Sequence, residues 1–242
     1  MYQKLKIICF HCIFLTYILG IFPLMAQNKL SISALAGVNF SRTISVPKSL
    51  YENGYSYSQE YMSGVNWAGF IKFTKKQITI VTGIGYKTLN FNFQRKYPYP
   101  YSYFETKYSS FPIQRTLAIV RLNYIYFPLK MHLFFGQKQM FFICSGIEYA
   151  MLVNDVNTES IQWPGPYMLT HEVHNWFKQT QLWIIVGAGI YMNSETTLNV
   201  EIGFTPKYVD KDVMNESGYF YFSKKLFEMR ITLSYDFFKF IF

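Results

Sequence analysis

The chain has 242 residues, a formal net charge of +9 and 50% hydrophobic residues, and aromatic residues make up 20% of it. This length allows one barrel or sandwich, or two small domains. Aromatic side chains suit pleated surfaces, so the composition favours β-structure. The basic residues form no concentrated run, which argues against a nucleic-acid partner.

The N-terminus predicts a secretory signal peptide over residues 1–26. Lys4 and Lys6 precede an apolar run at 7–22, and small residues offer a cleavage site. The run is shorter than the ~20 residues that a membrane-spanning helix needs. Residues 27–242 then form one domain.

Two of the three cysteines, Cys9 and Cys12, lie inside the apolar run and leave with the signal. This position does not fit a lipoprotein. Cys144 remains alone in the mature chain, so a disulfide within it is excluded.

Eight later stretches alternate apolar and polar residues with the period of two that is typical of strands. Two of them change phase, one near Lys87 and one at Pro128, and each change predicts a β-bulge. After the signal, no stretch is long and apolar enough for a membrane helix. The eight predicted strands are 29–40, 64–73, 77–93, 119–135, 139–151, 179–192, 196–205 and 226–242.

The connections between these strands alternate in length. Short polar turns are predicted at 74–77, 136–139 and 193–196. Loops of about 20 residues follow the other strands, at 41–62, 94–117, 152–176 and 206–225. Short turns at one rim and long loops at the other are typical of outer-membrane barrels. An even number of strands places both chain ends at the short-turn rim.

The last strand indicates which face meets lipid. Phe227 and Phe237 share one face with other apolar residues, while Glu228, Arg230 and Asp236 share the other. A basic residue facing lipid costs ~2–4 kcal/mol at the midplane, and an eight-stranded lumen is too narrow for the aromatic face. The predicted fold class is therefore all-β, an eight-stranded antiparallel transmembrane β-barrel with short periplasmic turns and long extracellular loops, in the bacterial outer membrane.

Charged residues on the inward faces predict a charge network in the lumen. One interpretation is a filled, salt-bridged interior; the other is a narrow polar path for ions or small solutes. Eight strands argue against a wide pore, since porins have about 16. The predicted members are Arg121, Glu148, Glu201, Glu228, Arg230 and Asp236.

The second long loop carries aromatic residues at alternate positions. Its flanking strands exceed the ~9–11 residues that cross a bilayer, so we expect this hairpin to rise above the membrane as an aromatic recognition surface. Anchoring at the level of lipopolysaccharide, or plain loop packing, stays open. The candidate recognition residues are Tyr97, Tyr99, Tyr101, Tyr103 and Phe104.

The histidines give weak signals of chemistry. His171 and His174 flank an acidic residue at a spacing that differs from HExxH; they could bind a metal loosely or lie in a solvated loop. Either one with Asp155 could serve a barrel enzyme, whereas His132 lies at the wrong rim. We expect no catalytic residue, no metal site and no cofactor.

The signal ending MAQ, the first strand ISALAGVNFS (32–41), the segment YIYFPLKMHLFFG (124–136) and the terminal Phe242 together resemble the PorT-like outer-membrane β-barrel family. The resemblance covers residues 27–242. It implies an outer-membrane barrel, with Phe242 as the signal that the assembly machinery reads. Some family members serve protein secretion, and the family has no catalytic motif. This chain has Tyr126 where many relatives carry an acidic residue.

The sequence thus predicts a non-enzymatic outer-membrane barrel with a filled polar lumen, acting in structure, binding or secretion-related interaction through its outer loops. The expected partners are outer-membrane lipid, lipopolysaccharide, the assembly machinery and a protein partner. One alternative is a narrow channel. A second alternative is a barrel-based hydrolase or acyl transferase.

Overall fold

A computed structural model describes residues 29–43, 56–101, 113–136, 140–162, 168–173, 177–207 and 225–241. Among these residues, no helix could cross a membrane. The described part of the chain forms nine strands: β1 Lys29–Thr43, β2 Ser56–Lys75, β3 Ile78–Tyr101, β4 Ile113–Phe135, β5 Phe141–Gln162, β6 Met168–Val173, β7 Thr180–Tyr191, β8 Thr196–Phe204 and β9 Leu226–Ile241.

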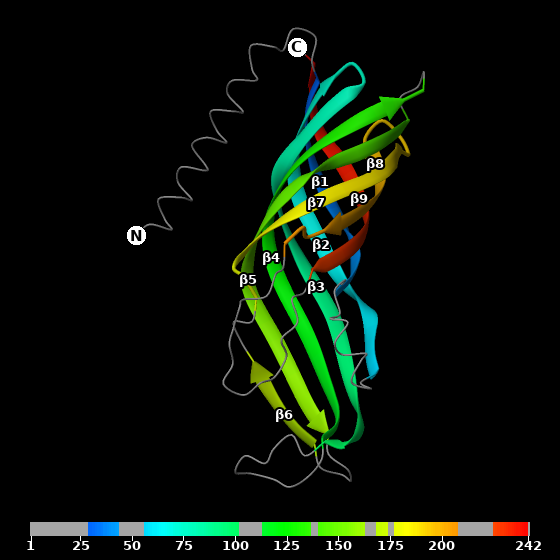
Figure 1. The fold of residues 1–242 in the computed structure, drawn as a ribbon. Coiled ribbons are helices and arrows are strands. Elements are labelled where there is room, and N and C mark those ends of the chain that lie inside the picture. Colours follow the sequence, from blue (N-terminus) through cyan, green and yellow to red (C-terminus); the bar gives the residue numbers. More distant parts are fainter. Residues whose placement is uncertain are drawn as a thin grey trace.

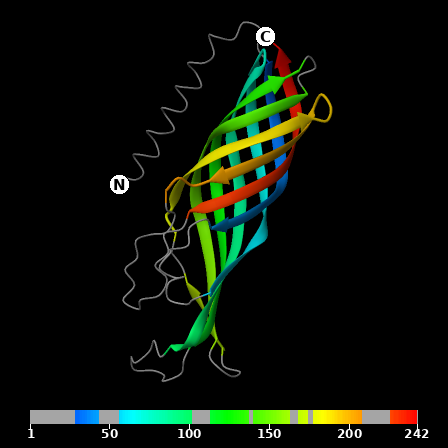
Figure 2. The same ribbon diagram turned by 45° about the vertical axis from the view of Figure 1, so that its right-hand side comes forward.

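Eight of these strands close into a ring. Each of β1 to β4 pairs antiparallel with the next strand, β5 pairs with β7, and β7, β8 and β9 follow in order. β9 pairs back with β1, where Lys29 lies opposite Ile241, so both ends of the ring meet at one rim (Figure 2). β6 pairs with β5 outside the ring. The predicted eight-stranded antiparallel barrel is confirmed.

The tight turns lie at the same rim as these ends. β2 and β3 are joined by Lys76 and Gln77, and Lys76 has a φ of 52°, the left-handed conformation that a two-residue hairpin requires. Between β7 and β8, the side-chain oxygen of Asn193 accepts hydrogen bonds from the backbone N–H groups of Glu195 (2.8 Å) and Thr196 (2.7 Å). We call this end the short-turn rim.

At the opposite end, one wall continues far beyond the ring. β3, β4 and β5 have 24, 23 and 22 residues, against 12 in β7 and 9 in β8. Their far parts, with β6 and the start of β2, form a curved sheet that projects past the closed barrel (Figure 1). We call this sheet the extension. The described parts of the predicted loops 94–117 and 152–176 are therefore strand, and the expectation of loops is wrong for these residues.

The predicted aromatic hairpin corresponds to the far ends of β3 and β4. Tyr97, Tyr99 and Tyr101 lie on β3, and Tyr101 pairs with Ile113. Tyr103 and Phe104 lie outside the described residues. The strands do extend as a hairpin, but β2, β5 and β6 widen it into a sheet.

The two predicted phase changes do not occur. On β3, alternate residues from Thr79 to Phe91 face inward without interruption, and Lys87 and Leu89 are both 0% exposed. On β4, the ladder to β3 skips the pair at Pro128 without a change of register, because proline has no N–H to donate.

The shifts of register lie elsewhere. β2 shifts against β3 between Tyr61 and Asn66, β4 against β5 at Asn123, and β1 against β9 at Ile32. None of these shifts changes which residues of β3 or β4 point into the barrel.

The polarity of the side chains on each face changes along β3 and β4. In the sequence, this change gives the same pattern as a β-bulge. Inside the ring, outward residues such as Ile84 and Leu129 are apolar; in the extension they become polar, as at Asn92 and Arg121. Inward residues change the opposite way, from Lys87 to apolar side chains beyond it. The ring thus exposes apolar side chains and buries charged ones, while the interior of the extension is mainly apolar, with Asp155 and Asn157 of β5 also buried in it.

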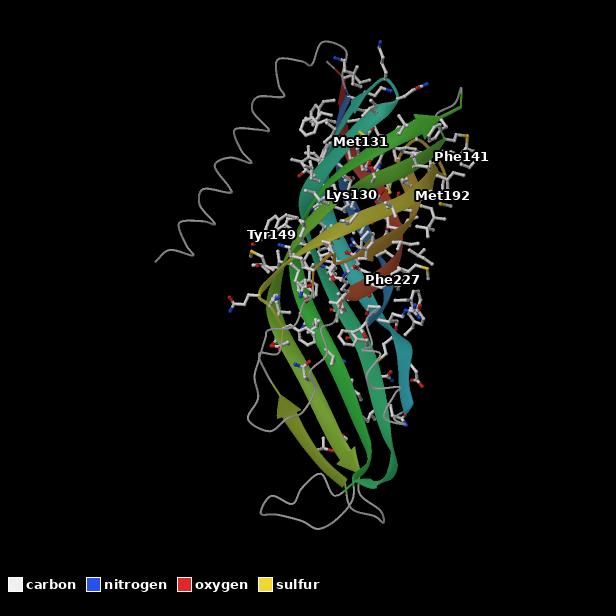
Figure 3. The ribbon with its side chains drawn as sticks, in the orientation of Figure 1. Lys130, Met131, Phe141, Tyr149, Met192 and Phe227 are labelled. Atoms are coloured by element: carbon white, nitrogen blue, oxygen red, sulfur yellow. The ribbon has the colours of Figure 1, made fainter. Side chains whose placement is uncertain are left out.

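The apolar belt around the ring has a defined height. It runs from Ile78 to Tyr86 on β3 and from Ile125 to Phe135 on β4. These spans of nine and eleven residues match the ~9–11 that a tilted strand needs to cross a bilayer. In Figure 3, side chains such as Met131 and Phe141 project from the belt near the short-turn rim.

Aromatic side chains lie at both edges of this belt. Trp67 stacks on Tyr86 at its far edge, with ring centroids 5.6 Å apart. Phe141, Phe237 and Phe238 are 57–60% exposed near the short-turn rim. Such girdles are typical of the two interfaces of a membrane barrel.

Candidate functional site

The interior of the ring holds a cluster of charged side chains from five strands. β3, β4, β5 and β8 contribute one residue each and β9 contributes two, all on inward positions of the period-two pattern. Each is between 0% and 3% exposed. We call this set the ion cluster; its members are Lys87, Lys130, Glu148, Glu201, Glu228 and Arg230.

Lys87 and Arg230 each bridge the same two carboxylates. The ammonium nitrogen of Lys87 lies 2.5 Å from Glu148 Oε1 and 2.7 Å from Glu228 Oε2. The guanidinium of Arg230 places Nη2 2.8 Å from Glu148 Oε2 and Nε 2.9 Å from Glu228 Oε1. Each carboxylate therefore meets one cation with each oxygen.

Lys130 and Glu201 extend the cluster towards the short-turn rim. Lys130 Nζ lies 2.6 and 2.7 Å from the two carboxylate oxygens of Glu201. Arg230 Nη1 is 3.8 Å from Glu201 Oε2 and links this pair to the other four residues. The thiol of Cys144, which is free and buried, lies 3.9 Å from Glu201.

The interior charges are balanced. The ion cluster contains three cations and three anions, and nearer the short-turn rim Lys72 Nζ lies 2.7 Å from Asp236 Oδ1. Lys72 also lies 3.4 Å from the hydroxyl of Ser234. Since an unpaired buried charge costs several kcal/mol, this balance is what allows so many charged side chains to be buried in the interior.

Aromatic rings enclose the middle of the cluster. Lys87 Nζ lies 3.9 Å above the Trp183 ring and 5.6 Å from that of Tyr126, within the range of cation–π attraction. The Tyr126 hydroxyl donates to Asn66 Oδ1 at 2.6 Å. Gly85 lies against the Tyr126 ring, where an added Cβ would overlap it.

Apolar and aromatic layers lie on both sides of the charges. Towards the short-turn rim, His132 stacks on Phe142 at 4.5 Å, and Phe134 and Tyr191 pack beside them. On the other side lies the buried core of the extension: Leu89, Phe91, Val120, Leu122, Phe177 and Leu226, each 0–1% exposed. The arrangement favours a filled interior.

The structure brings four predicted network residues, Glu148, Glu201, Glu228 and Arg230, into contact, and places Asp236 apart with Lys72. Arg121 does not join them: it is exposed on the outer face of β4, opposite Asn90. The predicted phase change at Pro128 assigned Arg121 inward, and without that change it faces out.

The predicted charge network left out three lysines, two of which alternation does place on inward faces, and Trp183 was not predicted as part of this interior. Lys72, Lys87 and Lys130 supply the positive charge that the predicted set lacked. That set held two cations against four anions, which is a signal that buried lysines were missing, because buried charges are paired.

The candidates for metal binding and catalysis remain predictions. Among the described residues, no group of His, Cys, Asp and Glu could hold a metal ion. His171 lies on β6, opposite Glu159, while His174 lies outside the described residues. Asp155 accepts a hydrogen bond from Asn157 at 3.1 Å. Phe242 also lies outside the described residues.

No protein-family model and no curated protein matches the sequence, so the resemblance to the PorT-like family stays a prediction. Solved structures similar to this chain include Ail, the attachment invasion locus protein of Yersinia pestis, at 6% identity and a TM-score of 0.37, covering 88% of this chain and 100% of that one.

Two further similar structures are an outer-membrane protease, OmpT from Escherichia coli, and the outer-membrane protein OprG from Pseudomonas aeruginosa. OmpT shares 12% identity at a TM-score of 0.37, covering 87% of this chain and 97% of its own. OprG shares 10% sequence identity at a TM-score of 0.37, and the match covers 89% of this chain and 96% of OprG. At these scores the barrel description rests on the strand pairings and side-chain facing alone.

Proposed function

We propose that this chain is a bacterial outer-membrane β-barrel with a sealed lumen, which acts through the outer surface of its extension and neither conducts nor catalyses. Residues 1–26 serve as its cleaved export signal and Phe242 as its assembly signal. The short-turn rim faces the periplasm, and the extension projects outside the cell.

The reversal of polarity along β3 and β4 carries this proposal. A soluble barrel has no reason to expose Ile84 at 54% and Trp67 at 57% while it buries Lys87 and Arg230 at 0–1%. In a bilayer the same arrangement is favoured, because apolar side chains meet lipid and charges stay inside. The polar outer face of the extension then marks where the wall enters water.

The extension supports a role in binding. Beyond the belt, its outer face carries Thr88, Asn90 and Asn92 on β3 and Asn123 on β4, all partly accessible. A rigid sheet raised above the membrane on long strands presents such a surface to other molecules. A protein partner is the occupant that we propose for this face.

The absence of conduction is proposed from the ion cluster and the layers on either side of it. Single-channel recording in a planar bilayer tests it, with insertion verified by protease protection. We expect no steady current from the wild-type protein. A steady ohmic current that disappears when Lys87→Met and Arg230→Met change the interior would establish the narrow channel instead.

The absence of catalysis is proposed from the states of the described acids and bases. Glu148, Glu201 and Glu228 are held in ion pairs, and His132 is stacked on Phe142. The test is lipid and peptide hydrolysis by the purified protein: activity that is lost in His171→Ala would establish the barrel enzyme.

A further inference from the structure

The outer wall carries a cation that no acidic group neutralises within the described structure. Arg42, the last outward residue of β1, is exposed and lies just past the apolar belt. Its guanidinium carbon lies 5.0 Å from the ring centroid of Tyr61 and 5.9 Å from that of Phe227. Phe227 is its neighbour across the β1–β9 ladder.

Among the described residues, this arrangement holds the guanidinium of Arg42 and leaves its N–H donors available. Aromatic rings contact the face of a guanidinium, whereas its N–H groups point outward in its plane and can meet two oxygens of one phosphate. Tyr61 is 51% exposed, so the group of Arg42, Tyr61 and Phe227 is accessible from outside the barrel. The nearest acid along β2, Glu60, accepts a hydrogen bond from Asn92 at 2.9 Å.

The position of Arg42, Tyr61 and Phe227 relative to the apolar belt indicates which molecules surround them. On β1, Val38 is 43% exposed within the belt, and Arg42 stands four residues further towards the extension. Aromatic and basic side chains at this level lie among lipid head groups. Arg121, also exposed, lies on the same wall three strands away, about 14 Å at ~4.8 Å per strand.

We infer that Arg42, with Tyr61 and Phe227, forms a binding site for a phosphorylated lipid head group of the outer leaflet. Arg42 binds the phosphate, the two rings fix the guanidinium, and the acyl chains lie along the belt below. Arg121 provides a second cation for a head group that carries two phosphates. The inference rests on the proposed membrane location and names a lipid that this wall selects.

The test uses the full mature barrel in a maltoside detergent, which carries no phosphate to compete. The probe is lipid A with both phosphates, and native mass spectrometry measures the fraction of protein that retains it over a titration. Dephosphorylated lipid A is the matched probe. We expect the phosphorylated form to bind at least tenfold more tightly.

The variants separate charge from packing. Arg42→Gln should weaken binding on the order of tenfold, and Arg42→Lys by less, because an ammonium keeps the charge but loses the planar fork. Tyr61→Leu with Phe227→Leu should also weaken it. Lys76→Asn, at the short-turn rim, is the matched control for loss of an exposed cation and should bind as the wild type does.

Two outcomes would overturn the lipid site but leave the proposed membrane location standing. In the first, Arg42→Gln binds as tightly as Lys76→Asn; in the second, removal of both phosphates changes nothing. Each applies while the wild-type protein still floats with liposomes and shows the gel shift on heating that is typical of folded barrels. Failure of the wild type in those two assays would overturn the proposed membrane location, and the lipid site with it.

Discussion

At the residue scale, the interior depends on mutual charge pairing. Lys130 and Glu201 form the most separable pair of the ion cluster, since the other four residues keep their shorter contacts without them. A buried carboxylate that loses its cation keeps the cost of desolvation without the compensating attraction, which destabilises the fold. Replacing both partners by an apolar pair of similar volume often leaves the stability unchanged.

Lys130→Met should therefore lower the free energy of unfolding by about 3–5 kcal/mol, and Lys130→Met combined with Glu201→Met should recover most of it. Chemical denaturation of the refolded protein in detergent micelles measures both values. A double variant that is less stable than Lys130→Met would show that charge pairing is not the source of the loss.

Glycine at one inward position makes room for a ring. An added Cβ at Gly85 would overlap Tyr126, whose hydroxyl binds Asn66, while nothing lies within 4 Å of the same position at Gly69, on the outer face of β2. Gly85→Val should cost about 1–3 kcal/mol through overpacking. Gly69→Val is the control and should leave the denaturation midpoint unchanged or raise it; equal effects would refute the packing argument.

At the element scale, the sequence predicted the strand ends at the short-turn rim, but not the far ends of β2, β3, β4 and β5. Strict alternation shows that a strand has two faces; it does not say which environment each face meets. On β3 the apolar set moves from Ile84 and Tyr86 to Leu89 and Phe91. In the proposed membrane location, the surroundings of the wall change there from lipid to water. The same signal in a sequence indicates a bulge, and this is why Arg121 was assigned inward.

The facing of β9 was predictable because its inward side chains stay polar and its outward ones stay apolar from Phe227 to Phe237. Glu228, Arg230 and Asp236 are buried, and Phe237 is exposed, as its alternation indicates. β6 could not be found in this way, since six residues in a polar context give too short a pattern.

The extension should be separable from the barrel. Replacing residues 94–117 by Asn-Gly joins Phe93 directly to its β4 partner Ala118 through a favoured two-residue turn. The core pair Phe91 and Val120 remains. We expect this variant to insert into liposomes and to keep the gel shift on heating, with binding of a protein partner lost. Aggregation in place of insertion would show that the extension is required for barrel assembly.

At the scale of the whole molecule, one boundary organises both halves. On the side of the short-turn rim, the ring holds a charge-balanced interior and an apolar outside. On the other side, the extension (Figure 1) packs a mainly apolar interior behind an outer face that carries polar residues. The barrel was predictable from strand number, turn lengths and inward glycines. The ion cluster was predictable in part, since its acids follow from alternation, but Lys87 lay at the supposed bulge.

The central claim is that this boundary is the surface of a membrane, and cysteine labelling along the outer face of β4 tests it most directly. In a Cys144→Ser background reconstituted in vesicles with the extension outside, Arg121→Cys and Asn123→Cys should react with a water-soluble maleimide. Leu129→Cys and Met131→Cys should stay unlabelled, and fluorophores attached there before reconstitution should be quenched by a quencher on the lipid chains. Equal labelling of all four positions, or lipid quenching at Arg121→Cys, would contradict the account.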